Sequence, residues 1–319
     1  MMKKICRSCA FMLPILIAFQ VEGQNEFFFG HHMFNPSYFS PGWIGSENEA
    51  FLSFNHRTQW AGYNASLDPG GAPTTQMLSL TAPVDGQLGG LGFFFVNDRV
   101  GPLTSVQMRA GISVKKEFSF GRVTLGIMPA MNMTSVNAGY FRANDDSDPL
   151  IPQGNETQFK PNLHSGILFE SRRNFFVSAS VENILEPSFS FGTTANNAIE
   201  RNYYLFGGTR RNLTRNIVFS PYVLLRSDLT SYSYEISSIL EYREKMWGGL
   251  SFRSSESITV LLGYSFLEEN KLRVGYSFDY IVSKSVAKEN TSHEIYVRYN
   301  LPNLIFAGRK AVKTPRFSF

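Results

Sequence analysis

The stretch KLRVGYSFDY, residues 271–280, alternates between two kinds of side chain along its whole length. The apolar set is Leu272, Val274, Tyr276, Phe278 and Tyr280, and the set between them is Lys271, Arg273, Gly275, Ser277 and Asp279. A β-strand places such sets on opposite faces, whereas a helix would mix them around its axis. The stretch therefore predicts a strand with one face in an apolar medium and the other in a polar one.

The same period of two recurs along the chain. It is clear over residues 105–115, 122–134 and 232–242, and weaker near 50–57, 74–82, 88–96, 160–170, 174–182, 201–210, 215–226, 246–253, 258–266 and 292–299. With the first stretch these make 14 strands, and single-chain bacterial membrane barrels have an even number. After residue 23 no apolar run approaches the ~18 residues of a helical span. A closed barrel is then the way in which this chain would cross a bilayer.

A soluble β-sandwich or jelly roll would alternate in the same way. Charges on the polar face favour the membrane barrel, because they suit a wet lumen better than a dry core: Arg109, Lys115, Glu235, Glu241, Arg273 and Asp279. Aromatic residues at strand ends would form an interfacial girdle: Tyr232, Tyr242, Tyr280 and Tyr299. We therefore predict an all-β fold, a transmembrane antiparallel β-barrel of about 14 strands over residues 49–300.

The first 23 residues differ from the rest of the chain. Lys3, Lys4 and Arg7 precede an apolar run, and small residues follow it, which is the pattern of a secretory signal peptide. We expect cleavage near Gly23/Gln24 and, with the barrel, an outer-membrane location. The divisions that follow are a signal peptide (1–23), an N-terminal segment (24–48), the barrel (49–300) and a basic C-terminal tail (301–319).

Composition excludes several classes of protein. Cys6 and Cys9, the two cysteines of the chain, both lie in the predicted signal, so a disulfide-stapled scaffold or a thiol enzyme is not expected. The formal net charge of +4 comes from the two ends, because the signal is positive and the tail has four cations and no acid. The charge is therefore no argument for nucleic-acid binding.

Connections of two lengths alternate between the predicted strands. The short ones lie near 83–87, 117–121, 171–173, 211–214, 243–245 and 267–270, and the long ones near 58–73, 135–159, 183–200 and 283–291. Outer-membrane barrels have short periplasmic turns and long external loops. With an even number of strands, both termini are then expected in the periplasm.

Motifs for catalysis or cofactor binding are missing from the sequence. There is no Gly-x-Ser-x-Gly elbow, Walker A loop or dinucleotide fingerprint, and the five histidines do not have zinc-ligand spacing. The acidic residues of 145–148 lack the glycine and distal glutamate of a calcium loop. We predict no catalytic residues, no cofactor and no metal, and therefore a protein that is not an enzyme.

Short motifs in a fixed order resemble one known family. They include Met33-Phe34-Asn35, Ser40-Pro41-Gly42-Trp43-Ile44-Gly45, Arg57-Thr58-Gln59-Trp60, Gly71-Ala72-Pro73-Thr74, Asn97-Asp98-Arg99-Val100-Gly101-Pro102, Trp247-Gly248-Gly249, Gly275-Tyr276-Ser277-Phe278-Asp279 and Ser292-His293-Glu294-Ile295. From about residue 27 to its end the chain resembles the PorP/SprF family of the type IX secretion system of Bacteroidota. Ser40-Pro41-Gly42 departs from the family's usual Asn-Pro-Ala.

The resemblance implies a function in protein secretion. Family members are outer-membrane proteins that help to secrete large surface proteins, such as gliding adhesins, and hold them at the cell surface. Some associate with periplasmic subunits of the secretion machine. The resemblance thus implies two protein partners, a large secreted surface protein and periplasmic secretion subunits, beside outer-membrane lipid. The alternative function is a plugged diffusion channel or a transporter of apolar substrates.

The N-terminal segment is the first candidate site. It combines irregular backbone with many aromatic residues, among them Phe34, Tyr38, Phe39 and Trp43. Such aromatic residues need a surface to cover them. We hypothesise that the segment enters the barrel and partly plugs it, and the alternative is that it packs against the periplasmic rim.

Two further segments are candidates for partner binding. Asn97, Asp98 and Arg99 are expected in an outer connection, where they contact a partner or merely form a turn. The tail offers a docking strap for a periplasmic partner, through Arg309, Lys310, Lys313, Arg316 and Phe317. Its alternatives are a barrel-assembly signal that ends at Phe319 and a disordered terminus.

Overall fold

Fourteen long strands form the wall of a barrel in the computed structural model, which describes residues 29–47, 49–63, 71–140, 154–191, 197–254, 256–282 and 289–301. These strands are β1 (Ala50–Thr58), β2 (Thr74–Pro83), β3 (Leu88–Val100), β4 (Leu103–Phe118), β5 (Gly121–Val136), β6 (Glu156–Ser171), β7 (Phe175–Glu182), β10 (Asn202–Thr209), β12 (Ile217–Ser227), β13 (Tyr232–Tyr242), β14 (Met246–Arg253), β15 (Ser257–Phe266), β16 (Leu272–Ile281) and β17 (Thr291–Leu301). The predicted signal peptide and residues 302–319 of the predicted tail lie outside the described residues.

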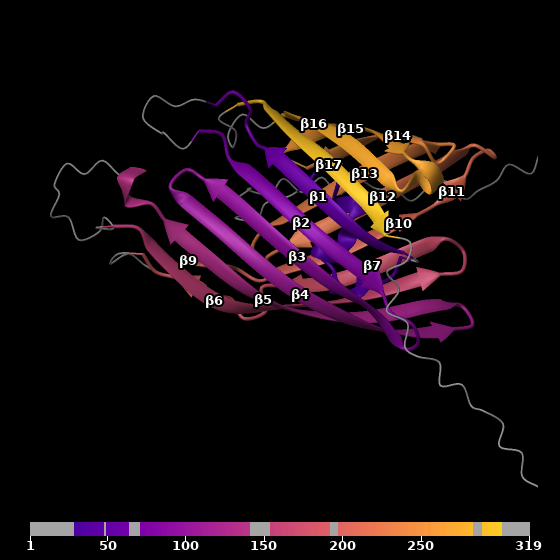
Figure 1. Cartoon of the computed structure of the whole chain (residues 1–319), viewed down its shortest axis with the longest axis horizontal. Helices are drawn as coiled ribbons and strands as arrows, with labels where there is room; N and C mark the ends of the chain where they lie inside the picture. The colour runs from indigo at the N-terminus through magenta and orange to yellow at the C-terminus, as the bar shows by residue number, and fades with distance from the viewer. Residues whose placement is uncertain are drawn as a thin grey trace, which may run out of the picture.

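The wall closes on itself through antiparallel pairs. Each strand pairs with its neighbours in the chain, β1 pairs with β17, and β10 pairs with β12. The first and last strands meet with Ala50 opposite Leu301, so both lie at one end of the barrel, here called the termini end. The other end, the loop end, holds the connections β1–β2, β5–β6, β7–β10 and β16–β17 (Figure 1). Closure leaves no free sheet edge along the paired wall.

Minor elements lie outside the wall. The pair β8 (Ser188–Phe189) and β9 (Asn197–Ala198) belongs to the β7–β10 connection, and β11 (Arg211–Asn212) belongs to the β10–β12 turn. Two 3-10 turns, η4 (Ala138–Tyr140) and η5 (Glu268–Asn270), are also in connections. In the part of the chain that the structure describes, no helix is long and apolar enough to cross a membrane.

The predicted barrel of about 14 strands is confirmed, and one local error concerns the end of β3. The prediction of a connection at Asn97, Asp98 and Arg99 is wrong, because β3 continues to Val100 and the turn comes after it. The strand continues because polar side chains pair across it: Asn97 donates to Gln76 at 2.7 Å, and Asp98 accepts from Thr75 at 2.6 Å. Turn-forming residue types were thus overridden by cross-strand partners.

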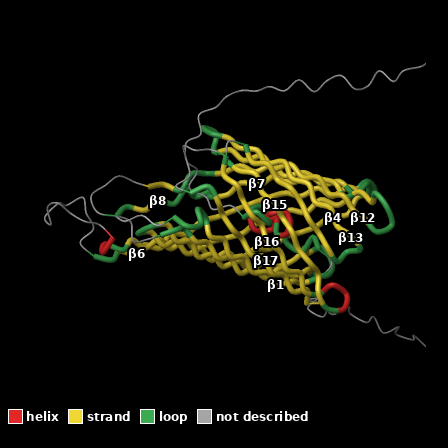
Figure 2. The backbone as a smooth tube through the Cα atoms, turned by 90° about the horizontal axis from the view of Figure 1, so that it is seen from above, coloured by secondary structure: helices red, strands yellow, loops and turns green. Residues whose placement is uncertain are grey.

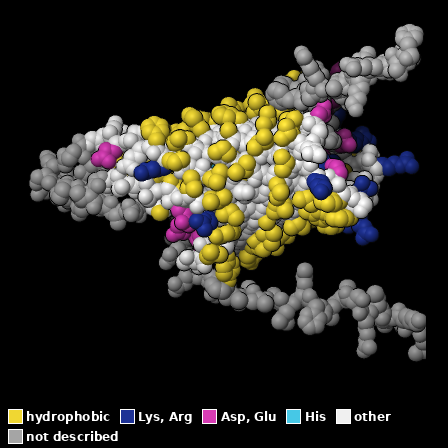
Figure 3. Space-filling model, turned by 90° about the horizontal axis from the view of Figure 1, so that it is seen from below, with side chains coloured by type: hydrophobic (Ala, Val, Ile, Leu, Met, Phe, Trp, Pro, Cys, Tyr) yellow, Lys and Arg dark blue, Asp and Glu magenta, His cyan; other side chains and the backbone are white. Residues whose placement is uncertain are grey.

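The two faces of the wall differ as the alternation predicts. On β16, Ser277 and Asp279 are fully buried inside the barrel, whereas Tyr276 and Tyr280 are exposed on the outside. Side chains of this outer set form a broad hydrophobic band across the face seen in Figure 3. An apolar exterior that encloses a charged interior fits a lipid bilayer.

A segment from the N-terminal side of β1 lies inside the barrel (Figure 2). This internal segment, residues 29–46, forms three short 3-10 turns, η1 (His32–Phe34), η2 (Pro36–Tyr38) and η3 (Pro41–Trp43). A proline opens each of the last two turns, where its fixed φ and missing N–H do no harm. The buried hydrophobic core of the molecule is therefore the interface between this segment and the inner wall.

Candidate functional site

The carboxylate of Glu294 holds the start of the internal segment. It accepts hydrogen bonds from the backbone nitrogens of Gly30 (2.6 Å) and His31 (3.2 Å), and from Asn55 Nδ2 (2.9 Å). His31 Nδ1 lies 2.8 Å from the same carboxylate. Arg57 is 3.8 Å from Glu294 and 2.6 Å from Asp279, which balances the buried charges. A buried carboxylate with this many donors is a strong anchor.

A second carboxylate faces the next residue of the segment. His32 Nδ1 lies 3.7 Å from Glu235, which Arg253 Nε contacts at 2.9 Å. Arg253 also reaches Glu256 at 2.7 Å. The inner wall over β13–β17 and β1 thus presents charges of both signs, which form ion pairs or hydrogen bonds with one another or with the segment.

Aromatic rings fill the space between these polar contacts. His31 stacks on Tyr296 with ring centroids 5.2 Å apart, and Phe34 packs on Trp247 at 4.5 Å. Asn35 closes this first half by donating to Ser53 at 3.1 Å and to Ser79 at 2.7 Å. The first half of the segment, residues 29–35, is therefore held mainly by polar groups, with aromatic rings packed beside them.

Arg109 is the central contact between segment and wall. Its guanidinium donates to the Tyr38 carbonyl oxygen at 3.0 Å and to the Tyr38 hydroxyl at 3.1 Å. It also forms a 2.6 Å ion pair with Glu182 and lies 4.3 Å from the centroid of the Tyr38 ring. One planar fork thus joins β4, β7 and the internal segment, which a single point charge could not do.

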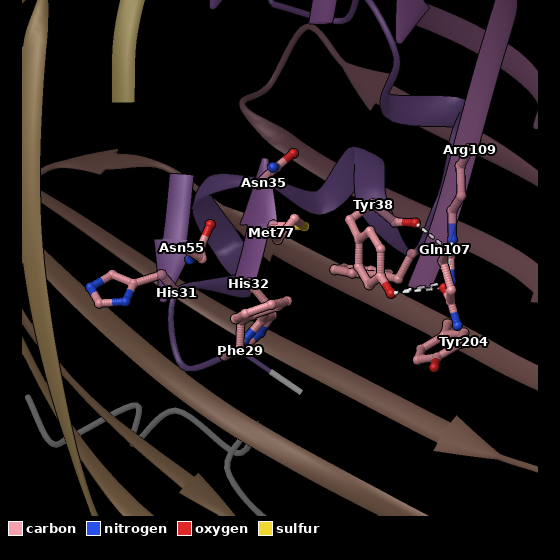
Figure 4. A pocket seen from close by; sticks show the side chains of 11 residues that line it. Phe29, His31, His32, Asn35, Tyr38, Asn55, Met77, Gln107, Arg109 and Tyr204 are labelled. Carbon is pink, nitrogen blue, oxygen red and sulfur yellow. Dashed lines mark hydrogen bonds between the residues drawn. The ribbon is translucent and has the colours of Figure 1, made fainter. Parts of the chain in front are cut away.

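A small cavity lies beside this contact (Figure 4). Its volume is about 30 Å³, and its lining includes His32, Asn35, Tyr38, Asn55 and Arg109. Asn35 Oδ1 and Asn55 Oδ1 accept no hydrogen bond from any described residue. A space of this size suits one or two water molecules rather than a substrate.

The second half of the segment, residues 40–45, lies directly against a wall of glycines. A Cβ added to Gly126 would be 2.1 Å from the Pro41 carbonyl oxygen, and one added to Gly42 would be 2.7 Å from the backbone nitrogen of Leu168. Gly90 and Gly45 approach each other as closely, since a Cβ on Gly90 would be 2.4 Å from the Gly45 Cα. Only glycine allows two backbones to come this near.

Each predicted plug residue is inside the barrel. Tyr38 and Phe39 are buried, and Phe34 and Trp43 are partly buried against the same core. Whether the segment blocks the passage of solutes stays a prediction. Sequence reasoning did not identify Glu294, the main anchor of the internal segment, as a site residue. The signal that could have identified it is its position on the inward face of β17, between the inward residues Ser292 and Tyr296.

The partner-binding candidates are separated. Asn97 and Asp98 lie on β3 with the cross-strand partners given above, and exposed Arg99 donates to the Tyr140 hydroxyl at 2.5 Å near the loop end. The tail candidates Arg309, Lys310, Lys313, Arg316 and Phe317 lie outside the described residues. Partner binding by residues 97–99 and by the tail residues stays a prediction.

The arrangement holds the internal segment against the inner wall. Its charged groups are engaged in ion pairs or hydrogen bonds with the internal segment and with each other. Within the described ranges, no cluster of three or more histidine, cysteine or acidic residues is arranged to hold a metal ion.

The apolar exterior, the charged interior and the closed wall of fourteen antiparallel strands define an outer-membrane β-barrel. Residues 21–299 match the family model of the type IX secretion system membrane protein PorP/SprF, and the chain belongs to this family. No curated protein matches the sequence.

Solved structures with a similar fold include a channel, a transporter and a FadL homologue. A deletion mutant of the monoaromatic hydrocarbon channel TodX has a TM-score of 0.50 and 8% identity, over 85% of this chain and 94% of that one. The Ralstonia pickettii toluene transporter TbuX has a TM-score of 0.49 and 8% identity, over 85% and 93%. A Pseudomonas aeruginosa FadL homologue has 0.48 and 10%, over 82% and 92%. At these identities the likeness concerns the fold alone.

Proposed function

We propose that this barrel helps to secrete a cognate large surface protein through the type IX system and then anchors that protein at the cell surface. The loop end faces outward and binds the surface protein, and the termini end faces the periplasm and contacts secretion subunits. Family membership supports the class of partner. The lengths of the connections support the orientation, because long external loops and short periplasmic turns are usual.

The position of the internal segment inside the barrel is the observation that carries the proposal. Residues 29–46 are fixed to the inner wall at Glu294, at Arg109 and along the glycine wall. The cavity beside them, about 30 Å³, is too small for an unfolded chain or a nutrient. A wall whose lumen is occupied in this way offers its two ends for binding.

The test is purification of the tagged protein from its native outer membrane in mild detergent, followed by mass spectrometry. We expect a large surface protein or periplasmic secretion subunits in near-stoichiometric amount. A single-residue variant, Arg99→Ala, should reduce recovery of the surface protein, because Arg99 is an exposed cation at the loop end. The matched control is Arg210→Ala, an exposed arginine at the termini end.

A channel or apolar-substrate transporter predicts the opposite result. The protein would then be recovered as a clean barrel without a protein partner, and it would conduct ions or take up substrate after reconstitution in a planar bilayer. That pair of results would replace the binding function with transport. Recovery of the surface protein at equal amounts with both arginine variants would remove Arg99 from the proposed contact.

A further inference from the structure

Two adjacent turns at the termini end hold five arginines, one of which, Arg210, pairs with Glu241 of β13 at 3.3 Å. The β6–β7 turn contains Arg172 and Arg173, and the β10–β12 turn contains Arg210, Arg211 and Arg215; neither turn contains an acid. The turns touch, because Arg210 N donates to the Asn174 carbonyl oxygen at 3.0 Å. All five arginines are exposed, and we call them the arginine rim.

Four phenylalanines lie directly beside the rim on the outer surface. Phe118 stacks on Phe120 at 5.4 Å, Phe120 meets Phe169 at 5.9 Å, and Phe169 meets Phe175 at 5.9 Å. This phenylalanine ladder joins the rim through Arg172 N, which donates to the Phe120 carbonyl oxygen at 3.3 Å. Phe120 is 60% exposed, a large value for a ring with no polar atom.

The ladder belongs to the lipid-facing side of the wall. Phe169 and Phe175 continue the exposed rows that contain Ile167 and Val177 on their strands. Lys116 adds a further cation here, with its Nζ 5.5 Å from the centroid of the Phe118 ring. Figure 3 shows Lys and Arg side chains at the right-hand end, next to the hydrophobic band, with Asp and Glu side chains also at this end.

We propose that the arginine rim and the phenylalanine ladder form a binding site for an anionic phospholipid in the leaflet at the termini end. Guanidinium groups bind phosphate through two parallel N–H donors, and rings at the depth of the first acyl carbons cover the lipid chain. A site that joins cations to lipid-facing rings requires an amphiphile with a negative head. A soluble acidic protein would meet the rim but would have to displace lipid to reach the ladder.

The β13–β14 and β15–β16 turns at the same end contain acids beside their cations. Lys245 follows Glu244 directly, and Lys271 forms a 3.0 Å ion pair with Glu269. These acids repel a phosphate as the lysines attract it. The two lysines therefore provide a control that removes the same charge at the same end of the barrel.

The experiment is native mass spectrometry of the full-length protein, delipidated in detergent and exposed to equal amounts of phosphatidylglycerol and phosphatidylethanolamine. We expect phosphatidylglycerol to bind preferentially to the wild type. The double variant Arg172→Gln/Arg173→Gln should bind about 25-fold less of it, since each of the two cations near a membrane surface contributes a factor of about five. The control Lys245→Gln/Lys271→Gln should match the wild type.

A second variant tests whether lipid binding depends on the rings as well as on the positive charge. Phe120→Asn leaves all the arginines in place but removes the most exposed ring of the ladder, so it should also lower phosphatidylglycerol retention. Equal binding of both lipids by the wild type would overturn the proposal. So would equal losses in the arginine and lysine variants, or unchanged retention in Phe120→Asn. These outcomes are independent of partner recovery, so the proposed secretion function can stand or fall separately.

Discussion

Residues 29–35 and residues 40–45 run through the same lumen but meet different parts of the wall. The first half binds to carboxylates of β13 and β17 and to serine hydroxyls of β1 and β2, with Glu294 as its main acceptor. The second half lies backbone to backbone on β3, β5 and β6, where Gly90 and Gly126 leave room for it.

The difference concerns what could replace each contact. If the first half left the wall, water could form hydrogen bonds with the polar groups that it exposes, and the free-energy cost would depend on how well water reaches them. Nothing can replace the fit of the second half, because an added carbon there meets backbone that cannot move aside. The first half is thus the releasable part of the segment, and the second half is its fixed part.

The largest effect is expected from Gly126→Ala. The added Cβ would lie 2.1 Å from the Pro41 carbonyl oxygen, so the second half must leave its place. We expect a loss of about 3 kcal/mol of unfolding free energy or failure to assemble, measured by denaturant unfolding in detergent. The control is Gly207→Ala, whose Cβ would meet only Phe176 O at 3.5 Å. Similar stability of the two variants would refute the close fit of the second half.

Glu294→Gln tests the first half. The substitution removes the charge that accepts from Gly30 and His31 and leaves Arg57 less well balanced. We expect a loss of about 2 kcal/mol and, because the first half is released, a higher single-channel conductance in a planar bilayer. Glu241→Gln is the control, since Glu241 pairs with Arg210 and Arg273 instead. Unchanged conductance with lowered stability would mean that the first half stays in place without its anchor.

Arg109→Lys tests the junction between the halves. Lysine can still pair with Glu182 but cannot also donate to both the carbonyl and the hydroxyl of Tyr38. A loss of about 1–2 kcal/mol is expected in the same unfolding measurement. Arg210→Lys, on the exposed rim, should change stability by less than about 0.5 kcal/mol. Equal values for the two variants would show that Tyr38 does not depend on the fork.

The smallest effect is expected from Ser113→Ala. Its hydroxyl donates to the Ile44 carbonyl oxygen at 2.6 Å, a single neutral hydrogen bond in the second half. We expect a loss of about 1 kcal/mol, with conductance unchanged because the glycine contacts remain. Ser135→Ala is the control, because the Ser135 hydroxyl on β5 accepts a hydrogen bond from Thr157 of β6 at 3.1 Å instead of contacting the segment. A rise in conductance would show that hydroxyl contacts, not close packing, hold the second half.

Alternation along the strands was enough to predict the wall. Residues 271–280 and 105–115 separate into an apolar and a polar set, and the structure places both stretches in strands whose faces differ accordingly. Strand ends were harder to predict, as β3 shows. The polar residues 97–99 read as a turn because their partners Gln76 and Thr75 come from another strand.

The contacts of the internal segment could not be predicted in the same way. Its aromatic residues indicated that it needs a cover, and nothing in its sequence pointed to Glu294, 264 positions away from Gly30. The glycines of β3 and β5 acquire a role only from Pro41, Gly42 and Gly45, which lie against them in the folded chain.

The sequence by itself determined the class of the protein and the direction in which each strand residue faces, because a period of two is a local property that every strand expresses. Only the tertiary structure decided which inward groups meet which part of residues 29–46. Those pairings depend on closure of the barrel, which brings β17 next to β1. Closure also places the charged side chains of β13–β17 and the glycines of β3 and β5 around the same lumen. Closure is a property of the whole chain, and no segment of the sequence carries it alone.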